Sequence, residues 1–391
     1  MKDEAYTSAQ SVTLFPPERP FVMDCGRTLA PVTIAYETYG ELNAAGDNAV
    51  LVCHALTGNA HAGGFASSDR RSAGWWEPLI GPGRGLDISR YFVICSNFLG
   101  SCYGTTGPVS VNPSTGRPYG PDFPQMTVRD MVRLQRALLD HIGVRSLTTV
   151  IGGSLGGMQV LEWGVMYPAF VRSMIPIATA AQHSPWCIGL NDIARQAIMN
   201  DPAWQAGRYP LSSQPRAGLS LARQVAMISY RSDVSFLARF GRERRGGAAP
   251  ATAAGAQVAG AVSPSGAGPD ARFDAGNLFQ VESYLRYQGD KLVDRFDANT
   301  YIAISRAMDL HDVALGRGDV RDVLGSLTMP ALCIGISSDV LYPVHEQKNI
   351  AGMIPLSTYR EIASPHGHDA FLIEYGQVAA HVRGFLRDHE L

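Results

Sequence analysis

The sequence predicts an α/β protein with a mostly parallel central sheet, flanking helices and an inserted helical cap. Short continuous apolar runs alternate with helical patterns in the first 180 residues, and the same pattern resumes near residue 328. Between these two parts, apolar residues recur with helical spacing instead. The length of 391 residues also exceeds what one core holds, because single cores stop growing near roughly 250–300 residues. Roughly 100 or more residues are therefore expected outside the main core.

Five strands and one long helix are expected in the first part. Residues 32–39 alternate as a half-buried strand, and residues 174–178 predict another strand. Three runs are apolar almost throughout, as are parallel strands buried on both faces. These runs are 49–54, 91–95 and 147–151. Residues 127–142 predict a helix with a capping-box start and Gly143 after its end. Strands that alternate with helices imply crossover connections and a parallel sheet.

The last part continues the same sheet. Residues 330–336 and 357–362 predict strands, and 369–386 predict a helix. The stretch between the two parts predicts helices, most clearly at 219–230 and 301–310.

These patterns divide the chain into three parts. We expect a first part of the core at 1–180, a helical cap at 181–325 and a second part of the core at 326–391. Residues 246–270 are rich in Ala, Gly, Pro and Ser, a composition that predicts a flexible surface loop.

Composition and charge exclude several classes of protein. The net charge of −2 lacks the basic excess of a nucleic-acid binder. The six cysteines form no C-x-x-C pair and no cluster with histidines, so we expect reduced thiols in a cytoplasmic protein and no metal site. No run approaches the ~20 apolar residues of a membrane span, and the acidic amino terminus is unlike a signal peptide.

The motif G-G-S-L-G at residues 152–156 is the clearest chemical signal. It lies between the predicted strand 147–151 and a helical stretch at 155–166, the strand–turn–helix setting that gives G-x-S-x-G its meaning. The glycines are needed because a sharp turn forces the serine into a strained backbone conformation. Ser154 is therefore the predicted nucleophile; the alternative is a plain helix-capping turn.

A nucleophilic serine needs a base, and the base needs an acid that orients it. In α/β-hydrolase chains the acid and then the base follow the serine in sequence. Asp339 follows the predicted strand 330–336, although strand-end aspartates also occur in ordinary turns. His368 and His366 both follow the strand 357–362, and spacing alone does not choose between them.

Acyl transfer also requires two backbone N–H groups that stabilise an oxyanion. One is expected from Leu155, directly after the serine. The other is expected from the loop after the strand 49–54, where Leu56 is the candidate and Gly58 lets the loop bend over the site.

Several longer blocks resemble the homoserine O-acetyltransferases of methionine biosynthesis, which have the α/β-hydrolase fold. The blocks extend over most of the predicted core and include one helix of the cap. They are CHALTGNAH (53–61), GWWEPLIGPGRGLD (74–87), RYFVICSNFLGSCYGTTGP (90–108), PYGPDFP (118–124), IGGSLGGMQ (151–159), ARQVAMISYRS (222–232) and GHDAFL (367–372).

This resemblance implies roles for individual residues. Ser154, Asp339 and His368 match the family's triad, and the GHDAF context selects His368 over His366. Arg223 and Asp369 match positions that hold the carboxylate and the amino group of an amino-acid substrate. A zwitterion needs one cation and one anion, and an arginine fork suits a carboxylate.

Tyr230 lies seven residues after Arg223 and hence on the same helix face. Both side chains are therefore expected to point toward the serine. The resemblance also implies a homodimer that assembles through the cap.

The function that the resemblance implies is acetyl transfer from acetyl-CoA to L-homoserine through an acyl-enzyme, with CoA as a substrate and no bound cofactor. One alternative keeps the triad but uses succinyl-CoA as donor or serine as acceptor. A second is an esterase or thioesterase, and a third is a non-catalytic binding protein on the same fold.

Overall fold

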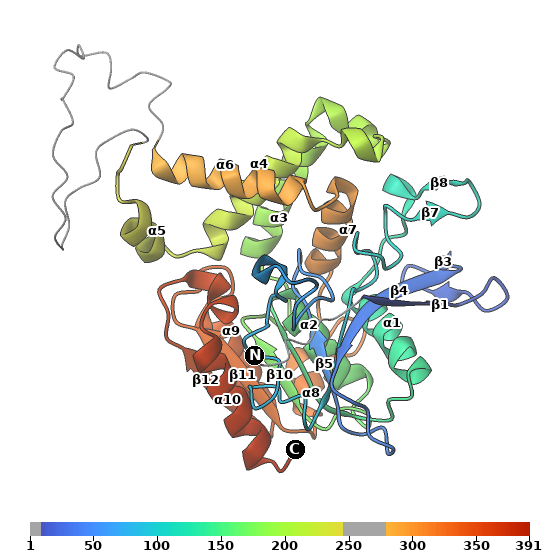
Figure 1. Cartoon of the computed structure of the whole chain (residues 1–391), viewed down its shortest axis with the longest axis vertical. Helices are drawn as coiled ribbons and strands as arrows, with labels where there is room; N and C mark the ends of the chain where they lie inside the picture. The colour runs from blue at the N-terminus through green and yellow to red at the C-terminus, as the bar shows by residue number, and fades with distance from the viewer. Residues whose placement is uncertain (1–8, 245–278) are drawn as a thin grey trace.

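The computed structural model describes residues 9–244 and 279–391 and shows a sheet flanked by helices, with further helices above it (Figure 1). The central sheet has eight strands in the order β1-β4-β6-β5-β9-β10-β11-β12. They are β1 Gln10–Leu14, β4 Val32–Tyr39, β5 Ala49–Cys53, β6 Phe92–Ser96, β9 Leu147–Gly153, β10 Met174–Ile177, β11 Ala331–Ile336 and β12 Ser357–Ile362. The predicted loop 246–270 lies outside the described residues.

The sheet is mostly parallel, which confirms the predicted fold class. The six strands from β6 to β12 in the sheet order pair in parallel, and only β4 runs antiparallel to its two neighbours. Two short hairpins lie outside it, formed by β2 Phe21–Val22 with β3 Thr28–Leu29 and by β7 Val111–Asn112 with β8 Arg117–Pro118.

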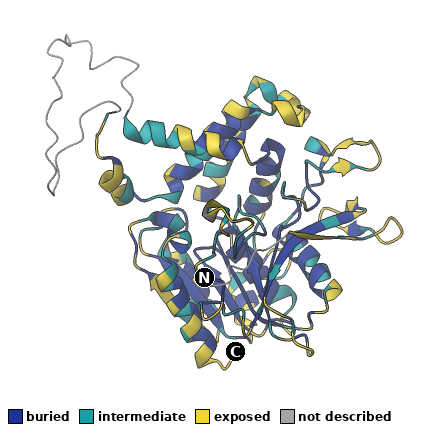
Figure 2. Ribbon diagram, viewed as in Figure 1, coloured by how far each residue is buried: buried dark blue, intermediate teal, exposed yellow. Residues whose placement is uncertain are grey.

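Helices cover both faces of the sheet, and its inner strands β5, β6, β9, β10 and β11 are buried along almost their whole length (Figure 2). Along β5, Leu51 faces one hydrophobic cluster and Val50 and Val52 face another, as the two-residue period of a strand requires. The first cluster includes residues of α1 Val128–His141, α2 Leu155–Met166, α8 Val320–Gly325 and α9 Val344–Met353. The second includes α10 Tyr375–Asp388.

The described α-helices between β10 and α8 form a layer over the edge of the sheet where α2 begins (Figure 1). These helices are α3 Pro185–Met199, α4 Arg216–Tyr230, α5 Asp233–Phe240, α6 Gln280–Val293 and α7 Ala298–Asp309. We call this layer the cap. Helix α4 packs between α3 and α6, so its inward residues are held by neighbours on both sides.

The predicted helix 369–386 is wrong as one continuous element. The structure has a 3-10 helix at Gly367–Leu372 and a separate α10 that begins at Tyr375. In a continuous α-helix the Phe371 carbonyl would accept the N–H of Tyr375. Here the Trp76 indole Nε1 donates to that carbonyl at 3.0 Å, a long-range contact that favours the break.

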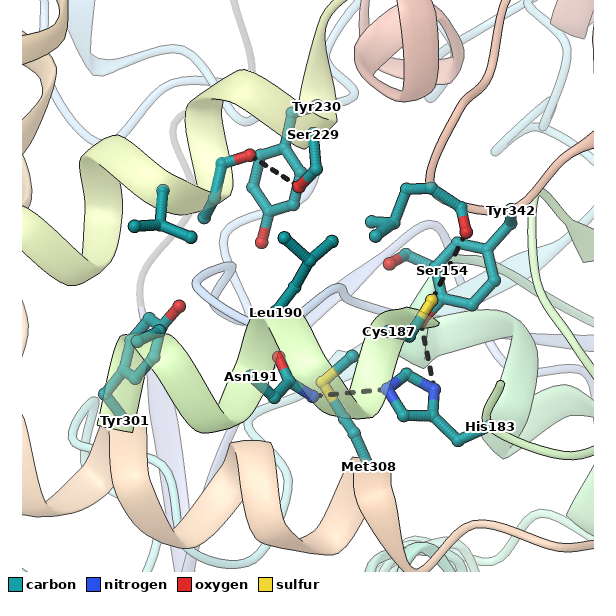
Figure 3. A pocket seen from close by; sticks show the side chains of 14 residues that line it. Ser154, His183, Cys187, Leu190, Asn191, Ser229, Tyr230, Tyr301, Met308 and Tyr342 are labelled. Carbon is teal, nitrogen blue, oxygen red and sulfur yellow. Dashed lines mark hydrogen bonds between the residues drawn. The ribbon is translucent and has the colours of Figure 1, made fainter. Parts of the chain in front are cut away.

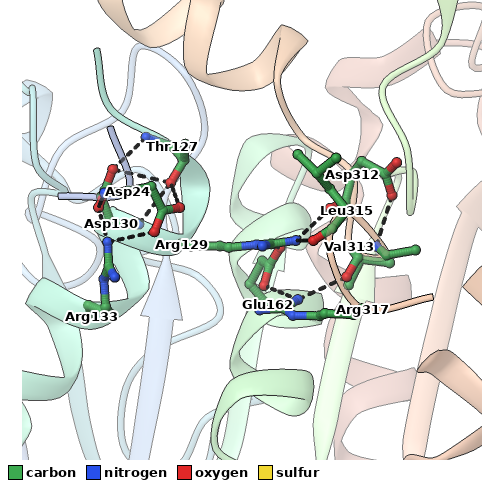
Figure 4. Close-up of polar contacts among 11 residues, drawn as sticks. Asp24, Thr127, Arg129, Asp130, Arg133, Glu162, Asp312, Val313, Leu315 and Arg317 are labelled. Carbon is green, nitrogen blue, oxygen red and sulfur yellow. Dashed lines mark hydrogen bonds and ion pairs between the residues drawn. The ribbon is translucent and has the colours of Figure 1, made fainter. Parts of the chain in front are cut away.

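Buried ion pairs fix α2, the helix that follows the G-x-S-x-G motif (Figure 4). The Glu162 carboxylate, 1% exposed, accepts from Arg129 of α1 at 3.1 Å and from Arg317 at 2.7 Å. Arg129 Nη2 also donates to the carbonyls of Asp312 and Leu315, at 3.0 and 2.7 Å. These contacts join α1, α2 and the segment that follows α7 into one unit.

Candidate active site

Ser154 lies on the sharp turn between β9 and α2. Its backbone has φ 60° and ψ −125°, which is costly for a residue with a side chain. The turn packs tightly on the end of β5: a Cβ at Gly152 would lie 2.6 Å from the Cys53 carbonyl oxygen, and one at Gly156 would overlap the same atom. Glycine at these two positions therefore permits the strained turn that presents the serine.

Asp339 and His368 are joined by a short hydrogen bond. His368 Nδ1 lies 2.7 Å from Asp339 Oδ2, and both residues are buried. The other carboxylate oxygen, Oδ1, accepts the backbone N–H groups of Leu341 and Tyr342 at 2.8 and 2.9 Å. Both oxygens of the acid are thus occupied, and the bond to Nδ1 leaves His368 Nε2 as the free nitrogen.

His366, the alternative base from the sequence, occupies a different position. It makes no hydrogen bond to Asp339, and its Nδ1 has no partner within the described part of the chain. The structure therefore brings Asp339 to His368 and not to His366.

Charges around His368 favour its protonated form. Burial disfavours the imidazolium, but the charge and hydrogen bond of Asp339, together with the charge of Asp369, outweigh burial and raise the His368 pKa above its ordinary value. Three aromatic rings surround the imidazole, with centroid distances of 5.2 Å for Tyr342, 5.6 Å for Phe371 and 5.7 Å for Tyr230. This packing holds the ring in one orientation.

Ser154 and His368 line one open cavity of about 540 Å³ that lies between the core and the cap. Arg223, Tyr230 and Asp369 line the same cavity. The Arg223 guanidinium lies 5.3 Å from the centre of the Tyr230 ring, within the range of a cation–π contact. A basic and an acidic side chain, from the cap and the core respectively, thus share one cavity with the serine and histidine.

Ser154 also borders a second, smaller cavity of about 20 Å³ on the cap side (Figure 3). That volume is close to the minimum that holds one water molecule. Its lining is mostly apolar and aromatic, with Leu190, Tyr230, Tyr301 and Tyr342 among the residues that surround it. No lysine or arginine belongs to the described lining.

The sequence reasoning did not single out Arg231, which pairs with Asp369. Arg231 Nε lies 3.5 Å from Asp369 Oδ2. Burial raises the pKa of Asp369, whereas Arg231, Arg223 and His368 oppose that rise. Arg231 is within the block 222–232 that carried the family resemblance, directly after the end of α4. Its distance from Asp369 in sequence left no local signal for the pair.

Of the two predicted oxyanion donors, Leu155 adjoins the serine in the chain and Leu56 lines the same cavity as the serine. Leu155 is the first residue of α2, where a backbone N–H has no partner inside the helix. Leu56 lies in the turn 55–58 and lines the open cavity, and its N–H donates to no other residue that the structure describes. From the cap, Arg295 Nη1 donates to the Thr57 carbonyl at 2.8 Å, so the cap contacts this turn directly.

The described residues contain no group of three or more His, Cys, Asp or Glu that could hold a metal ion. No helix within ranges 9–244 and 279–391 is long and apolar enough to cross a bilayer.

The strand–turn–helix serine and the Asp–His pair that follows it in sequence define an enzyme of the α/β-hydrolase fold. Residues 48–375 match the family model described as "alpha/beta hydrolase fold". Curated relatives narrow the family. The chain is 51% identical to the homoserine O-acetyltransferase of Moorella thermoacetica over 94% of this chain and 93% of the relative. It is 48% identical to the homoserine O-acetyltransferase of Carboxydothermus hydrogenoformans over 93% of this chain and 92% of the relative. The chain therefore belongs to the homoserine O-acetyltransferase family, whose members are acyltransferases.

Solved structures agree on the fold. The homoserine O-acetyltransferase of Bacillus anthracis superimposes with a TM-score of 0.86 at 28% identity, covering 98% of each chain. Esterase E22 superimposes with a TM-score of 0.85 at 26% identity, covering 97% of this chain and all of the other. Proteins named as a transferase and as an esterase thus share this architecture.

Proposed function

We propose that this protein transfers an acetyl group from acetyl-CoA to the hydroxyl of L-homoserine, giving O-acetyl-L-homoserine for methionine biosynthesis. The observation that supports this most is the placement of Arg223 and Asp369 in one cavity with Ser154 and His368. Arg223 would bind the carboxylate of an amino acid and Asp369 its ammonium group. A simple ester or thioester substrate needs neither contact.

The first half-reaction acylates the enzyme. His368 Nε2 takes the proton of Ser154 as Oγ attacks the thioester carbonyl, while Asp339 stabilises the imidazolium. The N–H groups of Leu56 and Leu155 stabilise the oxyanion. Collapse of this intermediate breaks the C–S bond, and the proton from His368 passes to the leaving thiolate to give CoA.

The second half-reaction reverses the roles. His368 removes the proton of the homoserine hydroxyl, whose oxygen attacks the acetyl ester, and returns the proton to Ser154 Oγ when the ester bond breaks. The cap over the serine favours transfer because it limits the access of water. The proposed reaction uses no metal or bound organic cofactor, since acetyl-CoA binds as a substrate and CoA leaves as a product.

The two cavities support an acetylated CoA as donor. Arg71, Lys291 and Arg295 line the open cavity in addition to Arg223, and such cations suit the phosphates of CoA. The small cavity beside Ser154 matches the size of an acetyl methyl group. A succinyl group would place a carboxylate there without a lysine or arginine among the described lining residues, which is unfavourable.

Turnover assays with matched substrates test this assignment. Acetyl-CoA and succinyl-CoA, each with homoserine and serine, are compared by CoA release and by product mass. We expect fast turnover only for acetyl-CoA with homoserine, and loss of all but a trace of it in Ser154→Ala. Faster turnover with succinyl-CoA or with serine would refute the donor or the acceptor, respectively.

An esterase or thioesterase is the second candidate, favoured by the likeness to esterase E22. It predicts CoA release at one rate with and without homoserine. A release rate that rises with homoserine in proportion to O-acetylhomoserine formed would exclude it.

We also propose a cytoplasmic homodimer that assembles through the cap. The cap exposes several large apolar side chains; they include Trp186, Ile193, Leu221, Ile228, Val234, Leu237 and Tyr287, each 49–70% exposed. Exposed apolar side chains on several helices of one layer favour an interface there, and the six cysteines are free thiols, as in the cytoplasm. Light scattering should give twice the mass of one chain; Leu221→Glu combined with Leu237→Glu should give a monomer. A monomeric mass for the unmodified protein would contradict this proposal.

A further inference from the structure

The peptide unit that contains the Leu56 N–H is held at its other end. Its carbonyl, Ala55 O, accepts the Gly58 N–H at 2.9 Å and lies 2.9 Å from His54 Nδ1. The unit is planar and trans, so its C=O and N–H point in opposite directions. Whatever fixes the direction of the Ala55 carbonyl therefore also fixes the direction of the Leu56 N–H.

His54 has one role available at this carbonyl. A carbonyl oxygen only accepts, so His54 Nδ1 must have the proton and donate it. The other nitrogen, Nε2, is buried and has no partner among the described residues, which agrees with a neutral Nδ1–H tautomer. Burial lowers the His54 pKa to about 4, so the ring is neutral at physiological pH.

The surroundings of His54 hold the ring in this position. It is 1% exposed and stacks on Phe98 with a centroid distance of 4.2 Å. A Cβ at position 58 would lie 3.0–3.1 Å from the His54 side chain, so Gly58 leaves the room that the ring needs. The His54 carbonyl accepts Gln159 Nε2 of α2 at 3.3 Å, which ties this residue to the helix that follows Ser154.

We propose that His54 is a positioning residue for the oxyanion hole: its Nδ1–H holds the Ala55 carbonyl so that the Leu56 N–H faces the oxyanion. The inference rests on the proposed acyl transfer through Ser154. This positioning role can be told from a purely structural one, because both half-reactions pass through an oxyanion. Losing the contact should slow both by a similar factor and leave acceptor binding unchanged.

Three variants of His54 distinguish a positioning role from a purely structural one. His54→Asn places an amide N–H near the position of Nδ1, His54→Gln places it near that of Nε2, and His54→Leu removes the donor. His311→Leu is the matched control, because His311 is also buried but neither of its ring nitrogens has a hydrogen-bond partner among the described residues, so the change removes no contact to the turn 55–58. The acylation rate is measured from the burst with p-nitrophenyl acetate, and transfer from steady-state kinetics with acetyl-CoA and homoserine. Melting temperatures report folding.

Removal of one oxyanion donor costs about 100- to 1,000-fold in rate, and a misdirected donor should cost less. We expect His54→Leu and His54→Gln to lose about 10- to 100-fold in both half-reactions, with the homoserine KM within about twofold of wild type. His54→Asn should recover most of this loss, and His311→Leu should stay near wild type.

Two results would overturn the inference. One is a folded His54→Leu or His54→Gln that acylates within about threefold of wild type; the other is a His54→Asn as slow as His54→Gln. If His54→Leu does not fold, the Asn and Gln pair still decides. A wild-type enzyme that gives a burst but no homoserine transfer would refute the proposed function alone, since the burst still tests His54.

Discussion

Replacing Asp339 with Asn should reverse the tautomer of His368. In the structure, Asp339 Oδ1 accepts two backbone N–H groups, and Oδ2 faces His368 Nδ1 at 2.7 Å. An asparagine would keep its oxygen toward the two N–H donors, because its NH₂ group cannot accept them. The NH₂ group would then face His368 Nδ1. Nδ1 would have to accept, the proton would move to Nε2, and the lone pair that removes the Ser154 proton would be lost.

The size of the expected rate loss can be taken from known cases, because Asn changes the tautomer of His368 but has nearly the same shape as Asp. The equivalent exchange in serine proteases lowers kcat about 10⁴-fold, which is about 5 kcal/mol of transition-state stabilisation. We expect a similar loss in the acylation rate, measured from the p-nitrophenyl acetate burst, and a melting temperature close to that of wild type. Asp312→Asn, a change at an aspartate outside the cavity of Ser154, is the matched control for the loss of one charge. A folded Asp339→Asn that keeps more than a tenth of the wild-type acylation rate would show that the tautomer of His368 does not control the reaction.

Three further outcomes follow from the same geometry. The acylation rate should fall with decreasing pH through the His368 pKa, which lies above its ordinary value of 6.5, because the base must be neutral. Asp369→Asn should shift this fall in rate to lower pH, since the charge of Asp369 raises the His368 pKa. An unshifted pH profile would contradict that effect of Asp369. Arg223→Met should raise the homoserine KM about 10- to 100-fold, which corresponds to the loss of a hydrogen bond to a charged group. The acylation burst should stay unchanged. A slower burst would show that Arg223 acts on acylation of Ser154 instead of on homoserine binding. Glu162→Leu should lower the free energy of unfolding in urea by about 3 kcal/mol, because Arg129 and Arg317 lose their buried partner. An unchanged free energy of unfolding would mean that these ion pairs do not stabilise the fold.

Sequence reasoning was most successful where function depends on local patterns. The turn at Ser154 follows from two neighbouring glycines and a flanking strand and helix. Most of the expected parallel strands were confirmed because they are continuous apolar runs; the strand 357–362 was confirmed although it contains Arg360 and Glu361. Strand β1 was not predicted. It is an edge strand whose residues are largely exposed or half-buried, so it has no such run.

Contacts between distant segments were beyond local patterns. The break before α10 is accompanied by a hydrogen bond from Trp76 to a carbonyl 295 residues away. The pairing of Arg231 with Asp369 depends on how the cap sits on the core. The arrangement around His54 likewise needs the turn geometry, since a histidine after a strand has no distinctive pattern by itself.

The proposed catalytic residues and two of the proposed acceptor-binding residues come from different parts of the chain. Ser154, Asp339 and His368 come from segments outside the insertion, whereas Arg223 and Tyr230 belong to a single helix within it. On the proposed function, changes confined to that helix would alter acceptor binding and leave Ser154, Asp339 and His368 in place. If the cap stops recognising an acceptor, water becomes the remaining one and the same core works as a hydrolase. On this proposal, the contacts of the cap with the acceptor decide whether one core acts as a transferase or as an esterase.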